Sequence, residues 1–353
     1  MPNSFDSLLL GRRQTELTLA LVELDRLDQA PQLAGKLRDL QAELAAKGLG
    51  GDIMTRLISL GNDRLTTRVI ELTAARHRLP PVDWCWLALG SEGRHEQTFV
   101  TDQDNGLIFN AADAREAEAM RALFLPFAQE ANQHLAACGF KLCSGQIMAG
   151  NPAWCLSFEE WRERFIDWVR RPEPAALLNA SIFFDLRPLV GKLDLGESLR
   201  TLLLGLTTDT PSFLYLMAEN ALQAQPPLNF RGEVAVEEGE TLDLKKYASR
   251  IFVDAARIFA LASGARAVHT AERLHEAGGL VGLNGGEVAA MNAAFAHILR
   301  LRLGQQLADR AAGKAEGGGL NPASLHELDR AILRESLRQA RRLQQRLKLN
   351  YTL

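Results

Sequence analysis

Two aspartates separated by one residue, Asp102 and Asp104, are the first pattern in this 353-residue sequence that suggests chemistry. Side chains two apart in a strand project from the same face, which would leave Gln103 on the other face. Two such carboxylates repel each other by roughly 4 kcal/mol at about 4 Å when the effective dielectric constant is about 20. A hard divalent cation, Mg²⁺ or Mn²⁺, would relieve that repulsion. We therefore expect Asp102 and Asp104 to hold metal, which could polarise a phosphate and activate an attacking hydroxyl.

A turn of small residues precedes the two aspartates. The sequence GSEGR, residues 90–94, follows the apolar run at 84–89, which is long enough for a buried strand. Gly90, Ser91 and Gly93 would let backbone N–H groups approach an anion, and the start of a short helix adds partial positive charge. The Ser91 hydroxyl and the Arg94 guanidinium are further candidates for phosphate contacts.

Each of these two patterns has a plain structural alternative. A Gly-Ser pair after an apolar run is usually only a turn, and acidic pairs at the same spacing recur elsewhere, for example at Glu23 and Asp25. The interpretation therefore depends on turn, connecting segment and acidic strand occurring in that order.

That order resembles a known family signature. Gly90-Ser91, ten intervening residues and Asp102-x-Asp104 are similar to the signature of the polymerase β-type nucleotidyltransferase superfamily. The fuller stretch GSEGRHEQTFVTDQDNGLIF most resembles the DUF294 nucleotidyltransferases of bacterial signal-transduction proteins, relatives of the PII-protein uridylyltransferases. We therefore expect an α+β fold, in which a small mixed-sheet nucleotidyltransferase domain is flanked by an N-terminal helical segment and a C-terminal helical bundle.

The resemblance also implies a third carboxylate on a later strand, and Asp185 in the apolar run SIFFDLRPL is the fitting candidate. It would be a metal ligand and would help to deprotonate an acceptor hydroxyl. Arg187, two residues on, is a candidate phosphate contact, but it could instead simply neutralise Asp185. The stretch LDLKKYASRIF resembles the helical substrate-binding domain of the family, so Lys245 or Lys246 could hold the β- or γ-phosphate; the alternative is a solvated basic face.

Leucine spacing predicts a helical module over residues 1–79, which braces the catalytic domain or mediates dimerisation, and Pro80-Pro81 ends it. We expect a nucleotidyltransferase domain over 80–192 and a helical substrate-binding domain over 193–353. Within the nucleotidyltransferase domain we expect a helix at 113–138, a strand at 141–148, an aromatic core helix from 158 to 168 and a strand around Asp185. The acidic stretch 233–240 is expected to be a solvated loop or a short hairpin, and 317–319 a flexible link.

Composition narrows the class of protein. The net charge of −3 gives no general attraction to nucleic acid, which makes template-directed synthesis an unlikely activity for this chain. The four cysteines form no C-x-x-C pair, so we expect reduced thiols and no structural zinc. Neither a membrane-spanning run nor a signal peptide is evident, and the expected compartment is the cytoplasm.

Two functions remain open from the sequence. The first is an enzyme, uridylyl- or adenylyltransferase-like, that moves a nucleotidyl group from an NTP to a hydroxyl of a protein or small-molecule acceptor in signalling or metabolic regulation. The second is a nucleotide-sensing regulatory module without turnover. A helical scaffold would leave the paired aspartates unexplained.

Overall fold

The computed structural model describes residues 4–235, 241–314 and 319–353, and side-chain burial from residue 11 onward. The described chain is mostly helical with a four-stranded sheet, which confirms the predicted α+β class. It divides into two compact units, each described by itself below. Unit 1 comprises Met1–Leu49, Arg56–Glu163 and Leu186–Arg200, and unit 2 comprises Gly50–Thr55, Arg164–Asp185 and Thr201–Leu353.

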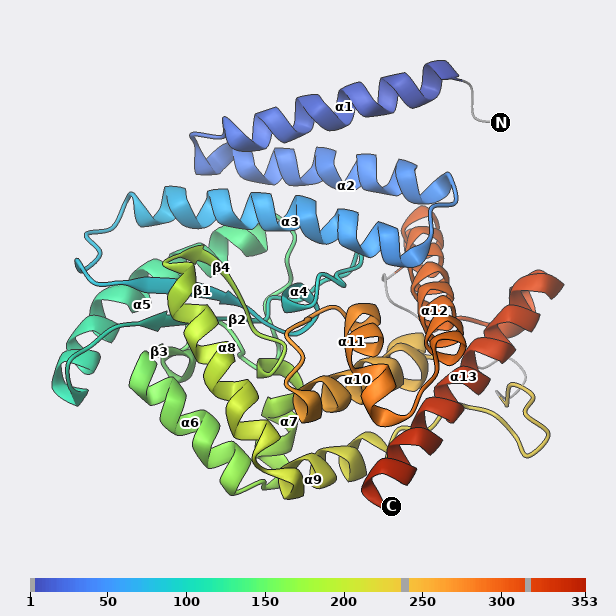
Figure 1. The fold of residues 1–353 in the computed structure, drawn as a ribbon. Coiled ribbons are helices and arrows are strands. Elements are labelled where there is room, and N and C mark those ends of the chain that lie inside the picture. Colours follow the sequence, from blue (N-terminus) through green and yellow to red (C-terminus); the bar gives the residue numbers. More distant parts are fainter. Residues whose placement is uncertain (1–3, 236–240, 315–318) are drawn as a thin grey trace. The chain divides into compact units, whose positions relative to one another are not determined.

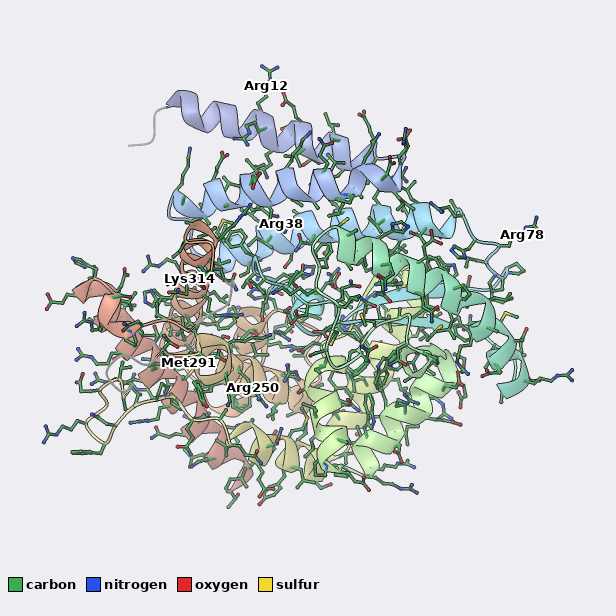
Figure 2. All side chains as sticks on the ribbon, turned by 180° about the vertical axis from the view of Figure 1, so that it is seen from behind. Arg12, Arg38, Arg78, Arg250, Met291 and Lys314 are labelled. Atoms are coloured by element: carbon green, nitrogen blue, oxygen red, sulfur yellow. The ribbon has the colours of Figure 1, made fainter. Side chains whose placement is uncertain are left out.

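The N-terminal helices of unit 1 confirm the predicted helical segment. In Figure 1 the first three run side by side, and Figure 2 shows Arg12 on the outer side of the first. Their bounds are α1 Ser4–Val22, η1 Leu27–Gln29, α2 Ala30–Ala46 and α3 Gly51–Ala74.

The sheet of unit 1 has the strand order β3-β2-β1-β4. The first strand pairs antiparallel with the second and the fourth, whereas the second and third are parallel, so the sheet is mixed as predicted. The remaining elements of this region are β1 Trp84–Ala88, α4 Gly90–Gly93, β2 Asn105–Phe109, α5 Ala114–Ala137, η2 Pro152–Trp154, β3 Cys155–Ser157 and β4 Arg187–Gly191.

One apolar core joins the N-terminal helices to the sheet. Leu37 of α2, Val69 of α3, Trp86 of β1 and Phe124 of α5 belong to the same buried cluster. The helices before Pro80 therefore share this core with the sheet, and Pro80, where we placed a domain boundary, lies inside unit 1. The helices brace the sheet, because they cover apolar side chains that would otherwise face water.

Two strand predictions need correction. Residues 141–148 form no strand but contribute only an isolated bridge between Lys141 and Asp102. Gln146 has a positive φ of 56°, which interrupts extended pairing. The strand predicted around Asp185 also begins later, because α7 (Pro174–Phe183) takes up its apolar beginning and β4 starts at Arg187.

Unit 2 is built from helices. The predicted aromatic helix is α6 (Phe158–Arg170), which begins in unit 1, and Phe165 and Trp168 are buried in its unit 2 part. Trp168 packs against Phe183 at the end of α7, with the ring centroids 5.3 Å apart, so this stripe is core as expected. The other helices are α8 Leu193–Thr208 (which begins in unit 1), α9 Pro211–Ala221, η3 Lys245–Ser249, α10 Arg250–Ser263, α11 Thr270–Ala277, η4 Gly278–Val281, α12 Gly285–Ala311, η5 Pro322–Ser324 and α13 Glu327–Tyr351.

Of the two predicted loops, residues 236–240 and 317–318 lie outside the described residues. Glu233, at the start of the first, is paired with Arg334 and Arg338 of α13. All four cysteines are free thiols, as expected. Among the described residues, no helix is both long and apolar enough to cross a membrane.

The core of unit 1 gives a first prediction. Phe124 is fully buried and stacks on Phe109 with a centroid distance of 5.2 Å. We expect Phe124→Ala to lower the free energy of unfolding by about 3–5 kcal/mol in urea titration, because it leaves a cavity. The neighbouring Leu123, 48% exposed on the same helix, is the control, and Leu123→Ala should cost less than about 1 kcal/mol. Equal losses would show that this core is placed wrongly.

Candidate functional site

The Gly-Ser turn forms where β1 ends. Leu89 is extended, with φ −125° and ψ 173°, and Gly90 then takes a positive φ of 52° at the start of the short helix α4. Only glycine adopts that conformation without a steric penalty. The predicted sequence of strand, small-residue turn and short helix is therefore confirmed.

Asp104 lies directly against this turn. A Cβ atom built on Gly90 would stand 2.8 Å from Oδ2 of Asp104, closer than real Cβ contacts allow. The Leu89 N–H also donates to the backbone carbonyl of Asp104, at 2.9 Å. The acidic segment and the glycine turn thus lie next to each other in unit 1, although Asp104 follows Gly90 by 14 positions in sequence.

The two aspartates precede β2 instead of lying inside it, which corrects the sequence prediction. Asp102 forms the bridge to Lys141 and is exposed, whereas Asp104 is partly buried. Between them, Gln103 is 2% exposed, and its amide donates to the carbonyls of Asn132 and Phe140. The polar side chain between the aspartates is therefore anchored in the protein interior.

The donor chemistry at Asp102 and Asp104 fits a hard cation. Among the described residues, no group of three or more His, Cys, Asp or Glu side chains is placed to hold a metal. Mg²⁺, however, is usually held by one or two carboxylates, with water and substrate phosphate oxygens as its other ligands. Asp102 offers an exposed carboxylate, and Asp104, two residues on, offers a partly buried one next to a turn too tight for a Cβ atom, so this type of oxygen ligand is present.

Arg187 connects the start of β4 to the turn. Its Nη2 donates to both carboxylate oxygens of Asp63 in α3, at 2.8 and 2.9 Å, and to the backbone carbonyl of Glu92, at 3.1 Å. Its Nε is buried and has no hydrogen-bond partner among the described residues. Arg187 thus pairs with Asp63, and the described contacts do not pair it with Asp185, the alternative that the sequence left open.

Glu92 is a buried acid that the sequence interpretation missed. Burial raises the pKa of Glu92 to about 8, and the charges of Asp63 and Asp104 raise it further while Arg187 lowers it. Burial also raises the pKa of Asp63, against the effect of Arg187. Glu92 is therefore protonated at neutral pH. It lies within the motif GSEGR and could have been singled out; Asp63, 41 positions before Asp104 in a helix, carried no such signal.

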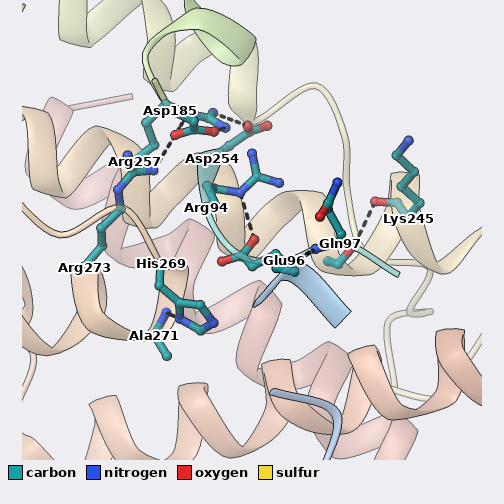
Figure 3. A network of polar contacts seen from close by, with 12 residues as sticks. Arg94, Glu96, Gln97, Asp185, Lys245, Asp254, Arg257, His269, Ala271 and Arg273 are labelled. Carbon is teal, nitrogen blue, oxygen red and sulfur yellow. Dashed lines mark hydrogen bonds and ion pairs between the residues drawn. The ribbon is translucent and has the colours of Figure 1, made fainter. Parts of the chain in front are cut away.

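The other predicted phosphate contacts lie in or beside α4. Gly93 is buried, and Ser91 is partly exposed. Arg94 caps the helix, and its Nε donates to Glu96 at 2.8 Å, as Figure 3 shows. Glu96 is 4% exposed, so the ion pair fixes the stem of Arg94 beside the turn.

Cys143 is a second neighbour that the sequence interpretation missed. Burial raises the pKa of the Cys143 thiol, and the charge of the nearby Asp104 carboxylate also raises it, while backbone hydrogen bonds lower it. The raised pKa favours the protonated thiol next to Asp104.

The contacts of Asp185 differ from those expected of a metal ligand. Asp185 is fully buried in the turn after α7, and its two carboxylate oxygens accept hydrogen bonds from Arg257 and Arg273 (Figure 3). Because Asp185 belongs to unit 2 and the aspartate pair to unit 1, its role as a third ligand stays a prediction. The observed contacts are those of a carboxylate neutralised by arginine.

The two candidate lysines are at the surface of unit 2. Lys245 and Lys246 are exposed in η3, a turn of π-helix that precedes α10. The Lys246 ammonium lies 4.8 Å from the ring centroid of Tyr247. Short π-helical turns are frequent at functional sites, but a role of these lysines in phosphate binding stays a prediction.

Comparison with protein families agrees with this site. Residues 35–175 match a family described as "Putative nucleotidyltransferase DUF294", and residues 211–351 match one described as "Putative nucleotidyltransferase substrate binding domain". No curated protein matches the chain. The first match contains the turn and both aspartates, which defines the class as a nucleotidyltransferase with a substrate-binding region. The chain belongs to the DUF294 family.

The raised pKa of Glu92 gives a pH prediction. The unfolded carboxyl titrates near 4.5 and the folded one at about 8, so the folded state holds a proton that the unfolded state releases between these values. Stability from this group is therefore complete below pH 4.5 and is lost as pH rises through about 8. Without divalent cations, the free energy of unfolding of Glu92→Gln should rise relative to that of the wild type by at most roughly 1.4 kcal/mol per pH unit in this window.

The measurement is urea unfolding at a series of pH values from 5 to about 8.5. Glu23→Gln, a substitution at an exposed carboxylate of unit 1, is the control and should keep the pH profile of the wild type. Parallel profiles for Glu92→Gln and the wild type would contradict a buried, protonated Glu92.

Proposed function

We propose that this chain is a metal-dependent transferase that moves an NMP group from an NTP to a hydroxyl of a protein or small-molecule acceptor. The observation that carries the proposal is the approach of Asp104 to Gly90, which leaves no room for a Cβ atom between them. An NTP bound as its metal complex needs both partners, carboxylates for the cation and a glycine turn for the phosphates.

Asp102 and Asp104 would hold Mg²⁺ or Mn²⁺, and the bound metal would polarise the α-phosphate. The triphosphate would bind the backbone of Gly90, Ser91 and Gly93. Side-chain contacts would come from Arg94 and from Arg187. The buried Nε–H of Arg187 donates to no partner among the described residues and could donate to a phosphate oxygen. These contacts favour in-line placement, and positioning with charge neutralisation supplies most of the acceleration in phosphoryl chemistry.

In the reaction that we propose, the acceptor oxygen attacks the α-phosphorus. A new oxygen–phosphorus bond forms, the bond to the β-phosphate bridge oxygen breaks, and pyrophosphate leaves. The acceptor hydroxyl releases its proton to solvent water, which balances the step. We do not assign that proton to Asp185, although the family resemblance implied this role, because both of its oxygens already accept from buried guanidinium groups.

The acceptor, the role of the two lysines, the base of the nucleotide and the oligomeric state are also proposals. The net charge of −3 disfavours nucleic acid as the acceptor, which leaves a protein or a small molecule in signalling or metabolic regulation. Lys245 and Lys246 would contact the β- or γ-phosphate, where a mobile ammonium suits the task. Uridylyl and adenylyl transfer are equally compatible with the described residues, and a homodimer is compatible with the exposed helices of the N-terminal segment.

One observation favours the second candidate, a nucleotide-sensing module without turnover. The carboxylate expected to complete the site, Asp185, is held by two arginines. With two carboxylates the site could still bind a metal–nucleotide complex but would lack a base for the acceptor.

Asp102→Asn tests the metal assignment of the proposed transferase. We expect it to lower transfer of label from an α-³²P-labelled NTP by at least about 10²-fold, because one negative ligand is lost from the metal. Asp83→Asn is the matched control, since Asp83 is exposed and precedes the other end of β1. Wild-type transfer by Asp102→Asn, with the fold intact by circular dichroism, would refute the metal assignment.

Thermal unfolding with each of the four NTPs, with and without Mg²⁺, separates turnover from sensing. Both functions predict that one NTP raises the melting temperature only with Mg²⁺, because a ligand stabilises the state that binds it. Turnover further predicts pyrophosphate release once the acceptor is supplied, whereas a sensor releases none. Absence of stabilisation by any NTP would contradict both.

A further inference from the structure

Asp185 lies in a buried cluster of charged side chains within unit 2. Nε and Nη2 of Arg257 donate to its two oxygens at 2.9 and 2.6 Å, and Nη1 of Arg273 donates to Oδ1 (Figure 3). Arg257 is fixed on its other side, because its Nη1 donates to Asp254 at 2.7 Å. All four side chains are at least 90% buried.

This setting is unsuited to a divalent cation. A metal could reach the carboxylate of Asp185 only if a guanidinium moved away, and that would leave a buried charge without its partner. A cation would also meet repulsion from both arginines in a region of low dielectric constant. The same contacts hold the backbone of Asp185 to α10 and α11, so the carboxylate acts as an anchor of the chain.

The chain leaves this anchor directly toward Arg187. Only Leu186, which is 1% exposed, separates the two residues, so their Cα atoms are at most about 7 Å apart. Arg187 then opens β4 opposite Ala88, the last residue of β1. Its Nη2 contacts Asp63 and the carbonyl of Glu92, which ties α3 and the Gly-Ser turn to the start of β4.

We propose that Asp185 is a positioning residue and not a metal ligand. The Arg257–Asp185–Arg273 clamp fixes the backbone one residue before β4. That anchor limits where the Arg187 guanidinium can reach, and Arg187 in turn holds the turn at Glu92. The inference deepens the proposed function, because it takes the turn as the phosphate site; the clamp itself is described without reference to a nucleotide.

Hydrogen–deuterium exchange tests the clamp without any ligand. Asp185→Asn should raise the exchange rate of β4 amides and of the Gly93 and Arg94 amides, which donate to Leu89 and Gly90 in the wild type. Asp254→Asn is the matched control, since it removes the other carboxylate on Arg257 but is not part of the segment leading to Arg187. It should change exchange in α10 and leave β4 and α4 as in the wild type.

Mn²⁺ binding, followed by electron paramagnetic resonance, separates positioning from ligation. Asp185→Asn should keep the Mn²⁺ affinity of the wild type within about twofold, whereas Asp102→Asn should weaken it by at least about tenfold. With Mn²⁺ present, both Asp185→Asn and Arg187→Gln should weaken binding of a non-hydrolysable NTP analogue by about tenfold, and the double variant should lose little more. Arg273→Gln, which leaves the Arg257 pair in place, gives the same readouts if Asp185→Asn does not fold.

Loss of Mn²⁺ affinity in Asp185→Asn equal to that in Asp102→Asn would overturn the inference. So would β4 and α4 amides that exchange as in the wild type in both Asp185→Asn and Arg273→Gln. If the wild type binds neither Mn²⁺ nor the analogue, the proposed function fails, and the exchange comparison still decides whether Asp185 positions Arg187.

Discussion

The close approach of Asp104 to Gly90 is the constraint on which the site depends. A side chain at position 90 would collide with the carboxylate, and the positive φ of 52° disfavours any residue with a Cβ atom. The hydrogen bond from Leu89 to the Asp104 carbonyl fixes the same contact through the backbone. Together these contacts bring an acidic segment to a backbone turn, two partners with opposite preferences for charge, within one unit.

The two buried carboxyl groups near this turn, those of Asp63 and Glu92, are stabilised in different ways. Asp63 stays next to Arg187, so α3 contributes to a region that its helical sequence did not suggest. Among the described residues, the Glu92 carboxylate forms no ion pair, and burial raises its pKa and so favours the protonated form. The result is a turn backed by a neutral acid and one arginine, which leaves the exposed Asp102 as the more accessible negative charge.

The sequence predicted those features that depend on short-range pattern. The strand β1, the turn at Gly90, the helix α5 and the aromatic face of α6 follow from periodicity or glycine conformation, and the structure confirms them. The strand predicted at 141–148 is wrong, because residue types alone do not reveal that Gln146 takes a left-handed conformation. The apolar run at 181–184 was ambiguous between helix and strand, since a short run carries no period.

The residues of the site were predictable to the same extent, and the errors in predicting their partners have a related cause. The motif from Gly90 to Asp104 is local, so its residue types and spacing carried the prediction. The partners of charged residues are set by tertiary contacts across long sequence separations. Asp63 with Arg187 and Asp185 with Arg257 are such pairs, and the sequence offered the nearer arginine as the partner of Asp185. Only the fold could reassign it.

In the proposed complex, a cation on the aspartate pair and a triphosphate on the glycine turn lie side by side. Electron–nuclear double resonance of the protein with Mn²⁺ and the NTP that stabilises it reports this contact through ³¹P couplings to the metal. We expect strong ³¹P coupling from the bound phosphates in the wild type and its loss in Asp104→Asn. A metal signal without phosphorus coupling, or one that persists unchanged in Asp104→Asn, would contradict it.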